Sequence, residues 1–222
     1  MKTLLSLFVV TLVINSYAFG QITMGPEVGG NMCTYFAQSY KTDIFLGLRA
    51  GFTANFGITN HWSLQPGIYY VQNQLNPRSI GGTIPSLKIN TIELPVSMVY
   101  SFGQDKIALP FIGAGFFAAY NAGGRTIIPG GDGPQLMPDI NRQLSVGSSL
   151  GNDIRAFDLG IAATAGIKLV NRLFVRLSMQ KGLVNLQPIS YPGNYMRSFA
   201  GSISMGYLFY YSSATRKVKE EK

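Results

Sequence analysis

Six ionisable residues are the most site-like feature of this 222-residue sequence: Glu27, Arg49, Glu93, Asp158, Lys168 and Arg176. Each stands in a segment where apolar residues alternate with small or polar ones, and each falls on the small or polar face. Three acids and three bases in one enclosed space could pair, conduct ions or transfer protons. Pairing is the interpretation we favour, because an unpaired charge away from bulk water is costly.

Counting residues from the end of each segment gives the height of a residue along its strand. By this count, four of the charged residues lie at two heights, which we call levels. Arg49 and Glu93 fall at one level, and Glu27 and Arg176 at another. We therefore predict that the six residues form a structural charge network that fills and blocks a narrow lumen. The prediction includes no catalytic residue, no cofactor and no metal site.

The sequence contains one histidine, His61, and one cysteine, Cys33, so a multi-histidine metal site and an internal disulfide are excluded. A hydrolase or acyltransferase would need a histidine beside a serine and an acid. His61 stands in a short turn beside Trp62, where we expect a solvated side chain. We expect Cys33 to be a small buried side chain near the end of the first strand.

Period-two alternation, the signature of a β-strand, places these residues. In one segment Ile92, Leu94 and Val96 alternate with Thr91 and Glu93. Helices are disfavoured, because glycine recurs inside these segments and costs about 1 kcal/mol at each helical position. In the least regular segment we assign Gly113 and Gly115 to the inner face. The alternation predicts eight strands: 22–33, 44–56, 62–70, 90–101, 107–120, 156–169, 172–180 and 198–209.

The composition indicates which face of these strands is inside. A soluble sandwich or lipocalin-type barrel buries its apolar face, whereas a membrane barrel turns that face to lipid. Charged residues make up only 13% of the chain against 46% hydrophobic residues and 26 glycines. The apolar faces also reach the roughly 9–11 residues that a membrane strand needs. We therefore predict an all-β, eight-stranded, antiparallel up-and-down transmembrane barrel, and a soluble apolar-cavity binder is the less favoured alternative.

Aromatic residues at the strand ends fit the interfacial girdles of such a barrel. We assign nine of them to these girdles: Trp62, Tyr69, Tyr70, Tyr100, Phe102, Tyr120, Tyr207, Tyr210 and Tyr211.

Short and long connections alternate, as in up-and-down membrane barrels. We expect tight periplasmic turns around 59–61, 103–105 and 170–172, and longer outer loops elsewhere. The longest, 121–154, is rich in glycine and proline and is expected to be irregular. It lacks the closely spaced acidic residues of a calcium-binding loop. Two interpretations remain open: a flexible surface loop, or a loop that binds a partner or ligand.

The two ends of the chain differ in character from the alternating region. Residues 1–20 have the charged start, apolar run and small residues of a cleaved signal peptide. We expect a barrel over 21–211, with both termini in the periplasm, and a charged tail over 212–222. The net charge of +8 is spread thinly. Because an exported membrane protein does not meet nucleic acid, we expect no nucleic acid partner. The tail is expected to contact anionic lipid headgroups or solvent.

Several short motifs resemble those of the PorT-like outer-membrane β-barrel family common in Bacteroidota. Residues 90–96 (NTIELPV) resemble its "leiP" strand, and 109–115 resemble its next strand. Residues 158–168 and 181–185 are similar to its closing section. The resemblance implies an outer-membrane barrel and, for the family's namesake, an association with protein secretion. The chain departs from the common terminal-aromatic insertion signal, because residues 212–222 follow Phe209.

Together these observations predict a small, monomeric barrel of the bacterial outer membrane. We expect it to be non-enzymatic and to present its outer loops for binding or structural roles. Its expected partners are outer-membrane lipid and an extracellular or periplasmic protein. A narrow transport or secretion-assisting barrel and an outer-membrane lipid-modifying enzyme are the alternatives.

Overall fold

The structure is a computed structural model, and it describes residues 22–37, 41–42, 44–75, 77–78, 86–103, 108–128, 140–149, 151–169, 171–188 and 195–211. The predicted signal peptide and C-terminal tail lie outside these residues. Within them, no helix is long and apolar enough to cross a membrane.

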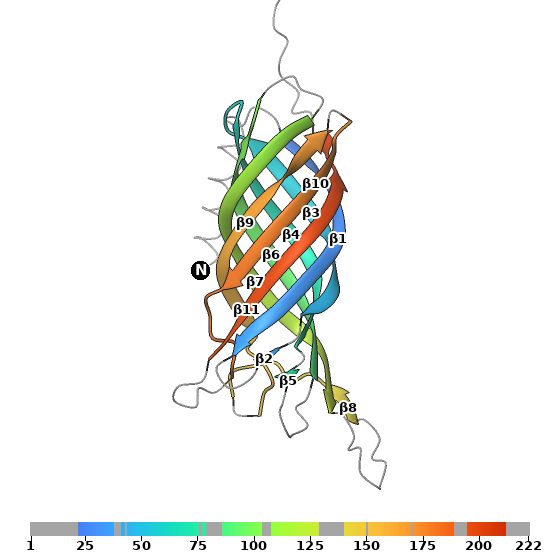
Figure 1. The fold of residues 1–222 in the computed structure, drawn as a ribbon, viewed down its shortest axis with the longest axis vertical. Coiled ribbons are helices and arrows are strands. Elements are labelled where there is room, and N and C mark those ends of the chain that lie inside the picture. The colour runs from blue at the N-terminus through green and yellow to red at the C-terminus, as the bar shows by residue number, and fades with distance from the viewer. Residues whose placement is uncertain are drawn as a thin grey trace, which may run out of the picture.

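Eight long strands form a closed antiparallel barrel, which confirms the predicted fold class. Each strand pairs with the next, and the last pairs with the first (Figure 1). The barrel strands are β1 (Ile22–Ala37), β3 (Phe45–Gly57), β4 (Trp62–Leu75), β6 (Ser86–Ser101), β7 (Ala108–Ile128), β9 (Phe157–Leu169), β10 (Leu173–Gly182) and β11 (Met196–Tyr207).

Four short strands distinguish the two ends of the barrel. β12 (Phe209–Tyr211) follows β11 and pairs with the start of β1. This end also carries the tight turns between β3 and β4 and between β9 and β10, and we call it the turn end. The opposite loop end carries β2 (Lys41–Thr42) paired with β5 (Pro77–Arg78), and β8 (Ile140–Gln143) paired with β7 (Figure 1, bottom).

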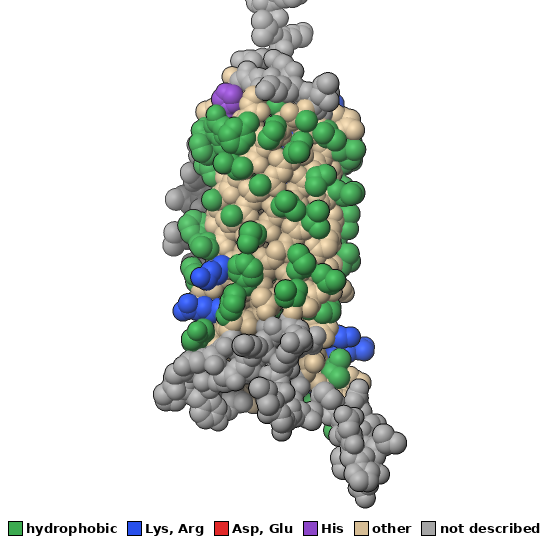
Figure 2. Space-filling model, in the orientation of Figure 1, with side chains coloured by type: hydrophobic (Ala, Val, Ile, Leu, Met, Phe, Trp, Pro, Cys, Tyr) green, Lys and Arg blue, Asp and Glu red, His purple; other side chains and the backbone are tan. Residues whose placement is uncertain are grey.

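The predicted alternation holds along the wall, with the apolar side chains outside. On β6, Ile92, Leu94 and Val96 are 41%, 49% and 44% exposed, whereas the intervening Thr91 and Glu93 are buried in the lumen. Figure 2 shows apolar side chains over the whole height of the visible barrel wall. An apolar outer wall around a polar lumen is the arrangement that a surrounding hydrocarbon layer favours.

The longest strand, β7, corrects the prediction that 121–154 is irregular throughout. Its register with β6 shifts between Asn90 and Thr91, which leaves Ala122 as the extra residue of a β-bulge. Gly123 and Gly124 follow with φ of 136° and 153°, values that side-chain-bearing residues rarely adopt. Beyond the bulge β7 continues to Ile128 and pairs with β8, so this part of the connection is an ordered hairpin arm.

The aromatic assignment is partly corrected. At the turn end, the Tyr100 ring lies 5.0 Å from both the Trp62 and Phe102 rings. These rings form an exposed cluster of the kind expected in an interfacial girdle. The assignment of Tyr69 to the girdle is wrong, because this side chain points into the lumen and is 1% exposed. The side chains of Tyr210 and Tyr211 lie outside the described structure.

Candidate functional site

Glu27 and Arg176 meet inside the barrel at one level. Arg176 Nη1 lies 3.2 Å from Glu27 Oε2. The same oxygen accepts a hydrogen bond from the Tyr69 hydroxyl at 2.7 Å, and Oε1 accepts one from the Ser204 hydroxyl at 2.6 Å. The four residues come from β1, β10, β4 and β11. One buried carboxylate therefore joins four strands.

Arg49 and Glu93 form the second ion pair. Arg49 Nη1 lies 2.5 Å from Glu93 Oε1, and both side chains are buried. Gln180 Nε2 donates to the same oxygen at 2.8 Å. The Arg49 guanidinium stacks over the Tyr69 ring, 3.8 Å from its centroid, which is a cation–π geometry. Because Tyr69 also donates to Glu27, it connects the two levels.

Lys168 joins this network through amides. Arg176 Nη2 donates to Gln65 Oε1 at 2.9 Å, and Gln65 Nε2 donates to Asn55 Oδ1 at 2.7 Å. Lys168 Nζ donates to the same Asn55 oxygen at 3.4 Å. Its ammonium group lies 5.5 Å from the Phe111 ring centroid, so an aromatic face also contributes to its surroundings.

Asp158 stands apart from the other five candidates. Its Oδ2 accepts a hydrogen bond from the Ser198 hydroxyl at 2.5 Å, toward the loop end. Lys168 lies on the same strand toward the turn end, and the two side chains are too far apart to pair. The structure thus brings four predicted residues into two ion pairs and Lys168 into their hydrogen-bond chain, and it separates Asp158.

Large and small side chains fill the rest of the lumen together. Tyr69, Phe111 and Phe174 are almost completely buried there. The cavity beside Arg49 and Arg176 has a volume of about 20 Å³, which is room for about one water molecule.

The predicted network lacks its uncharged polar members. They are Asn55, Gln65, Tyr69, Gln180 and Ser204, and each stands at an inward position of its strand. The alternation along each strand already indicates this inward position, so it is the signal in the sequence that identifies them.

A hydrophobic cap covers the lumen at the loop end. Leu144, Ile154, Leu186 and Met196 pack against strand residues from the first and fourth barrel strands. Ile154 is completely buried, and its segment forms a bridge with Val146. The backbone of Leu186 forms two hydrogen bonds that hold the cap together. Its carbonyl oxygen accepts one from the Arg155 amide, and its own amide donates one to the Met196 carbonyl oxygen. We call residues 144–149, 151–156 and 183–188 the cap, which packs against Met196 at the start of β11.

Asp153 is the polar centre of the cap. Its carboxylate pairs with Arg142 at 2.5 and 2.9 Å. It also accepts hydrogen bonds from the Ser145 amide at 2.9 Å and from the Thr126 hydroxyl at 3.1 Å. Two charged residues of the predicted outer loop, Arg142 and Asp153, therefore hold the cap segment to β7 and β8.

Acidification should loosen this attachment. Burial raises the pKa of Asp153, but hydrogen bonds from Arg142, Ser145 and Thr126 and the charge of Arg142 outweigh burial and hold that pKa below its usual value. The folded pKa is thus lower than the unfolded one. The stabilisation is complete above the unfolded pKa, at about pH 4, and is lost as the pH falls through the folded pKa.

The amide proton resonance of Ser145 is the direct readout of this titration. Its chemical shift should change with a midpoint below about pH 4, and the change should be absent in Asp153→Asn. A midpoint above the usual aspartate pKa would contradict the stabilising role of Arg142.

His61 and Cys33 both have structural surroundings. His61 Nδ1 lies 3.3 Å from the Ser101 carbonyl oxygen, and its ring stacks on Tyr100, so it connects a turn to the neighbouring strand end. Cys33 is a buried free thiol, as predicted, next to the backbone of Gln74. No group of three or more metal-ligating side chains occurs in the described part of the chain.

Comparison with protein families adds an independent observation. The model of the "Outer membrane protein beta-barrel domain" family matches residues 16–187, which is more than half of the chain. The chain belongs to this family. The match concerns the general family, and the PorT-like resemblance remains a prediction. No curated protein matches the chain.

Solved structures of outer-membrane barrels are similar to this chain at low sequence identity, and OprG shares its fold. OprG from Pseudomonas aeruginosa is 10% identical with a TM-score of 0.51, and the alignment covers 86% of this chain and 97% of OprG. Ail from Yersinia pestis is 10% identical, with coverages of 84% and 98% and a TM-score of 0.42. Neisserial surface protein A is also 10% identical, with coverages of 84% and 97% and a TM-score of 0.45. Family and fold together support a location in the bacterial outer membrane.

Proposed function

We propose that this protein is a non-enzymatic outer-membrane barrel that presents its loop end for binding or for a structural role. The observation that carries the proposal is the filled lumen: two buried ion pairs and large aromatic side chains occupy it, and a hydrophobic cap covers its loop end. An interior that is this full leaves the loop end as the surface available for specific contacts.

The proposed orientation places the loop end outside the cell. β1 begins and β12 ends at the turn end, so both ends of the described barrel lie at the same end of it. Short turns on the periplasmic side and long outer loops are the usual arrangement of these barrels. We expect a monomer, with outer-membrane lipid as its surroundings and an extracellular or periplasmic protein as its partner.

The two alternatives receive less support from the geometry. A narrow transport barrel would need a path through the lumen, and the cavity beside Arg49 has room for about one water molecule. A lipid-modifying enzyme would need a histidine free to act as a base. The His61 ring is instead held against the Ser101 carbonyl and Tyr100. A secretion-assisting role rests on the PorT-like resemblance alone.

Migration on denaturing gels tests whether the chain is a membrane barrel. The purified protein should require detergent for solubility, and unboiled and boiled samples should migrate differently because the closed sheet resists unfolding by detergent. A stable monomer in detergent-free buffer, with no effect of boiling on migration, would contradict the proposal.

A further inference from the structure

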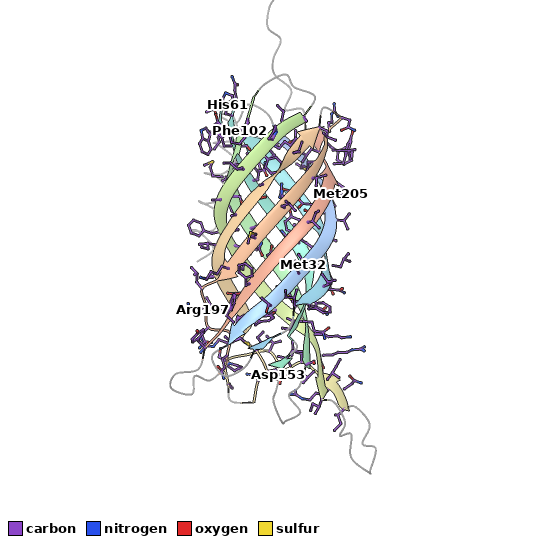
Figure 3. All side chains as sticks on the ribbon, in the orientation of Figure 1. Met32, His61, Phe102, Asp153, Arg197 and Met205 are labelled. Carbon is purple, nitrogen blue, oxygen red and sulfur yellow. The ribbon has the colours of Figure 1, made fainter. Side chains whose placement is uncertain are left out.

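Four exposed basic residues face outward near the loop end of the barrel. Lys88 lies on β6, Arg125 on β7, Lys181 on β10 and Arg197 on β11. We call them the basic collar. Figure 2 shows Lys and Arg side chains on both the left and the right edge of the barrel near its lower end, and Figure 3 labels Arg197 at the lower left.

The collar marks the margin of the apolar wall. On β10 the outward residues from the turn end are Leu173, Val175, Leu177 and Met179, and Lys181 follows them. On β6 the outward residues Ser86, Lys88 and Asn90 are polar, and the exposed apolar residues begin at Ile92 and continue toward the turn end. Since membrane strands leave the hydrocarbon region where their outward apolar residues end, the collar lies at headgroup height.

Like charges stand next to each other in the collar. Lys88 is the direct register partner of Arg125, and both side chains are exposed on the outer face. Lys181 is the register partner of Phe199, so Arg197, two residues along the same strand, is its diagonal neighbour. Like charges at directly opposed positions destabilise a sheet. The directly opposed Lys88–Arg125 pair therefore points to a bound anion, and the diagonal Lys181–Arg197 pair places a second pair of like charges on the outer face.

The described acids do not neutralise this collar. Glu27, Glu93 and Asp158 are buried in the lumen, and Asp153 is held in the cap by Arg142. In the view of Figure 2 the described outer wall shows Lys and Arg but no Asp or Glu.

We propose that the basic collar binds anionic lipid headgroups, through their phosphate groups, in the leaflet that surrounds the loop end. The inference rests on the proposed membrane placement and adds a lipid class to it. Anionic headgroups supply a counter-charge that the described acids do not provide at the height where the collar lies. Each basic residue near an anionic surface strengthens the attraction by roughly five-fold. A neutral or zwitterionic surface would leave the Lys88–Arg125 repulsion in place.

Spin-labelled lipids measure this selectivity on the intact barrel in phosphatidylcholine membranes. The wild-type barrel should select spin-labelled phosphatidylglycerol over spin-labelled phosphatidylcholine. The variant Lys88→Gln/Arg125→Gln should lose selectivity by about five-fold or more. The matched control Lys88→Arg/Arg125→Lys exchanges the two residues without changing their charge, and it should keep the wild-type selectivity.

Three results would overturn the inference. Equal affinity of the wild-type barrel for both lipids would remove the headgroup preference, and equal loss in both variants would show that charge is not the cause. Displacement of the anionic lipid by an equal concentration of inorganic phosphate would assign the collar to free phosphate. Heat-modifiable migration of each variant separates these results from a failure of the barrel assignment, which would abolish that migration in the wild type.

Discussion

Replacing Glu27 with leucine should destabilise the barrel by about 3–5 kcal/mol, because it leaves a buried guanidinium without its carboxylate. Arg176 lies 3.2 Å from Glu27 Oε2. The hydroxyl groups of Tyr69 and Ser204 lose the same acceptor. The loss therefore exceeds that of one hydrogen bond, which contributes about 0.5–1.5 kcal/mol.

Urea unfolding of the detergent-solubilised barrel measures this effect. The double variant Glu27→Leu/Arg176→Met removes both charges and should recover most of the lost stability, because replacing a buried pair by apolar residues is often close to neutral. An unchanged midpoint for Glu27→Leu, or a double variant less stable than the single one, would contradict the pairing of these two residues.

The second large effect is expected at Gly115 on β7, where a valine should strongly impair folding. A Cβ atom there would lie 2.0 Å from the Val96 carbonyl oxygen and 2.6 Å from the Ser97 Cα atom. Both are backbone contacts with the paired strand, so a flexible side chain cannot move to relieve them. Overpacking of an interior costs about 1–3 kcal/mol and more where the neighbours cannot move.

Gly30 provides the matched control for this substitution. It is exposed on the outer face of β1, and a Cβ atom there would meet nothing within 4 Å. Gly30→Val should fold as well as the wild type, since valine favours strands. The fraction of protein with folded migration on unboiled gels compares the two variants, and equal yields would show that the inner face at Gly115 is not tightly packed.

The barrel could be predicted from the sequence because the alternation of inward and outward residues along a strand is a local property. The alternation of Ile92 and Leu94 with Thr91 and Glu93 depends on neighbouring residues alone, and the structure keeps it. Analogy with the neighbouring segments also placed Gly113 and Gly115 on the inner face, and the burial of Phe111 and Phe117 at the same parity on β7 confirms it. The cap was not predicted, because the burial of Ile154 depends on partners that are distant in the sequence.

The lumenal site was predictable to the extent that the height of each residue along its strand could be counted from the strand end. This count placed Arg49 level with Glu93 and Glu27 level with Arg176, and these residues pair in the structure. It could not show that Asp158 binds a serine hydroxyl, because that contact depends on the stagger between strands. Tyr69 differs from its prediction for another reason: β4 continues to Leu75, so Tyr69 does not stand at a strand end and its inward position places it in the lumen.

Single-channel recording on the purified barrel in a planar bilayer tests the filled lumen most directly. Two ion pairs, the stacked Tyr69 and the cap predict a membrane-inserted protein without a stable open conductance. A stable, large conductance from the wild-type barrel would contradict the account and would favour a transport role.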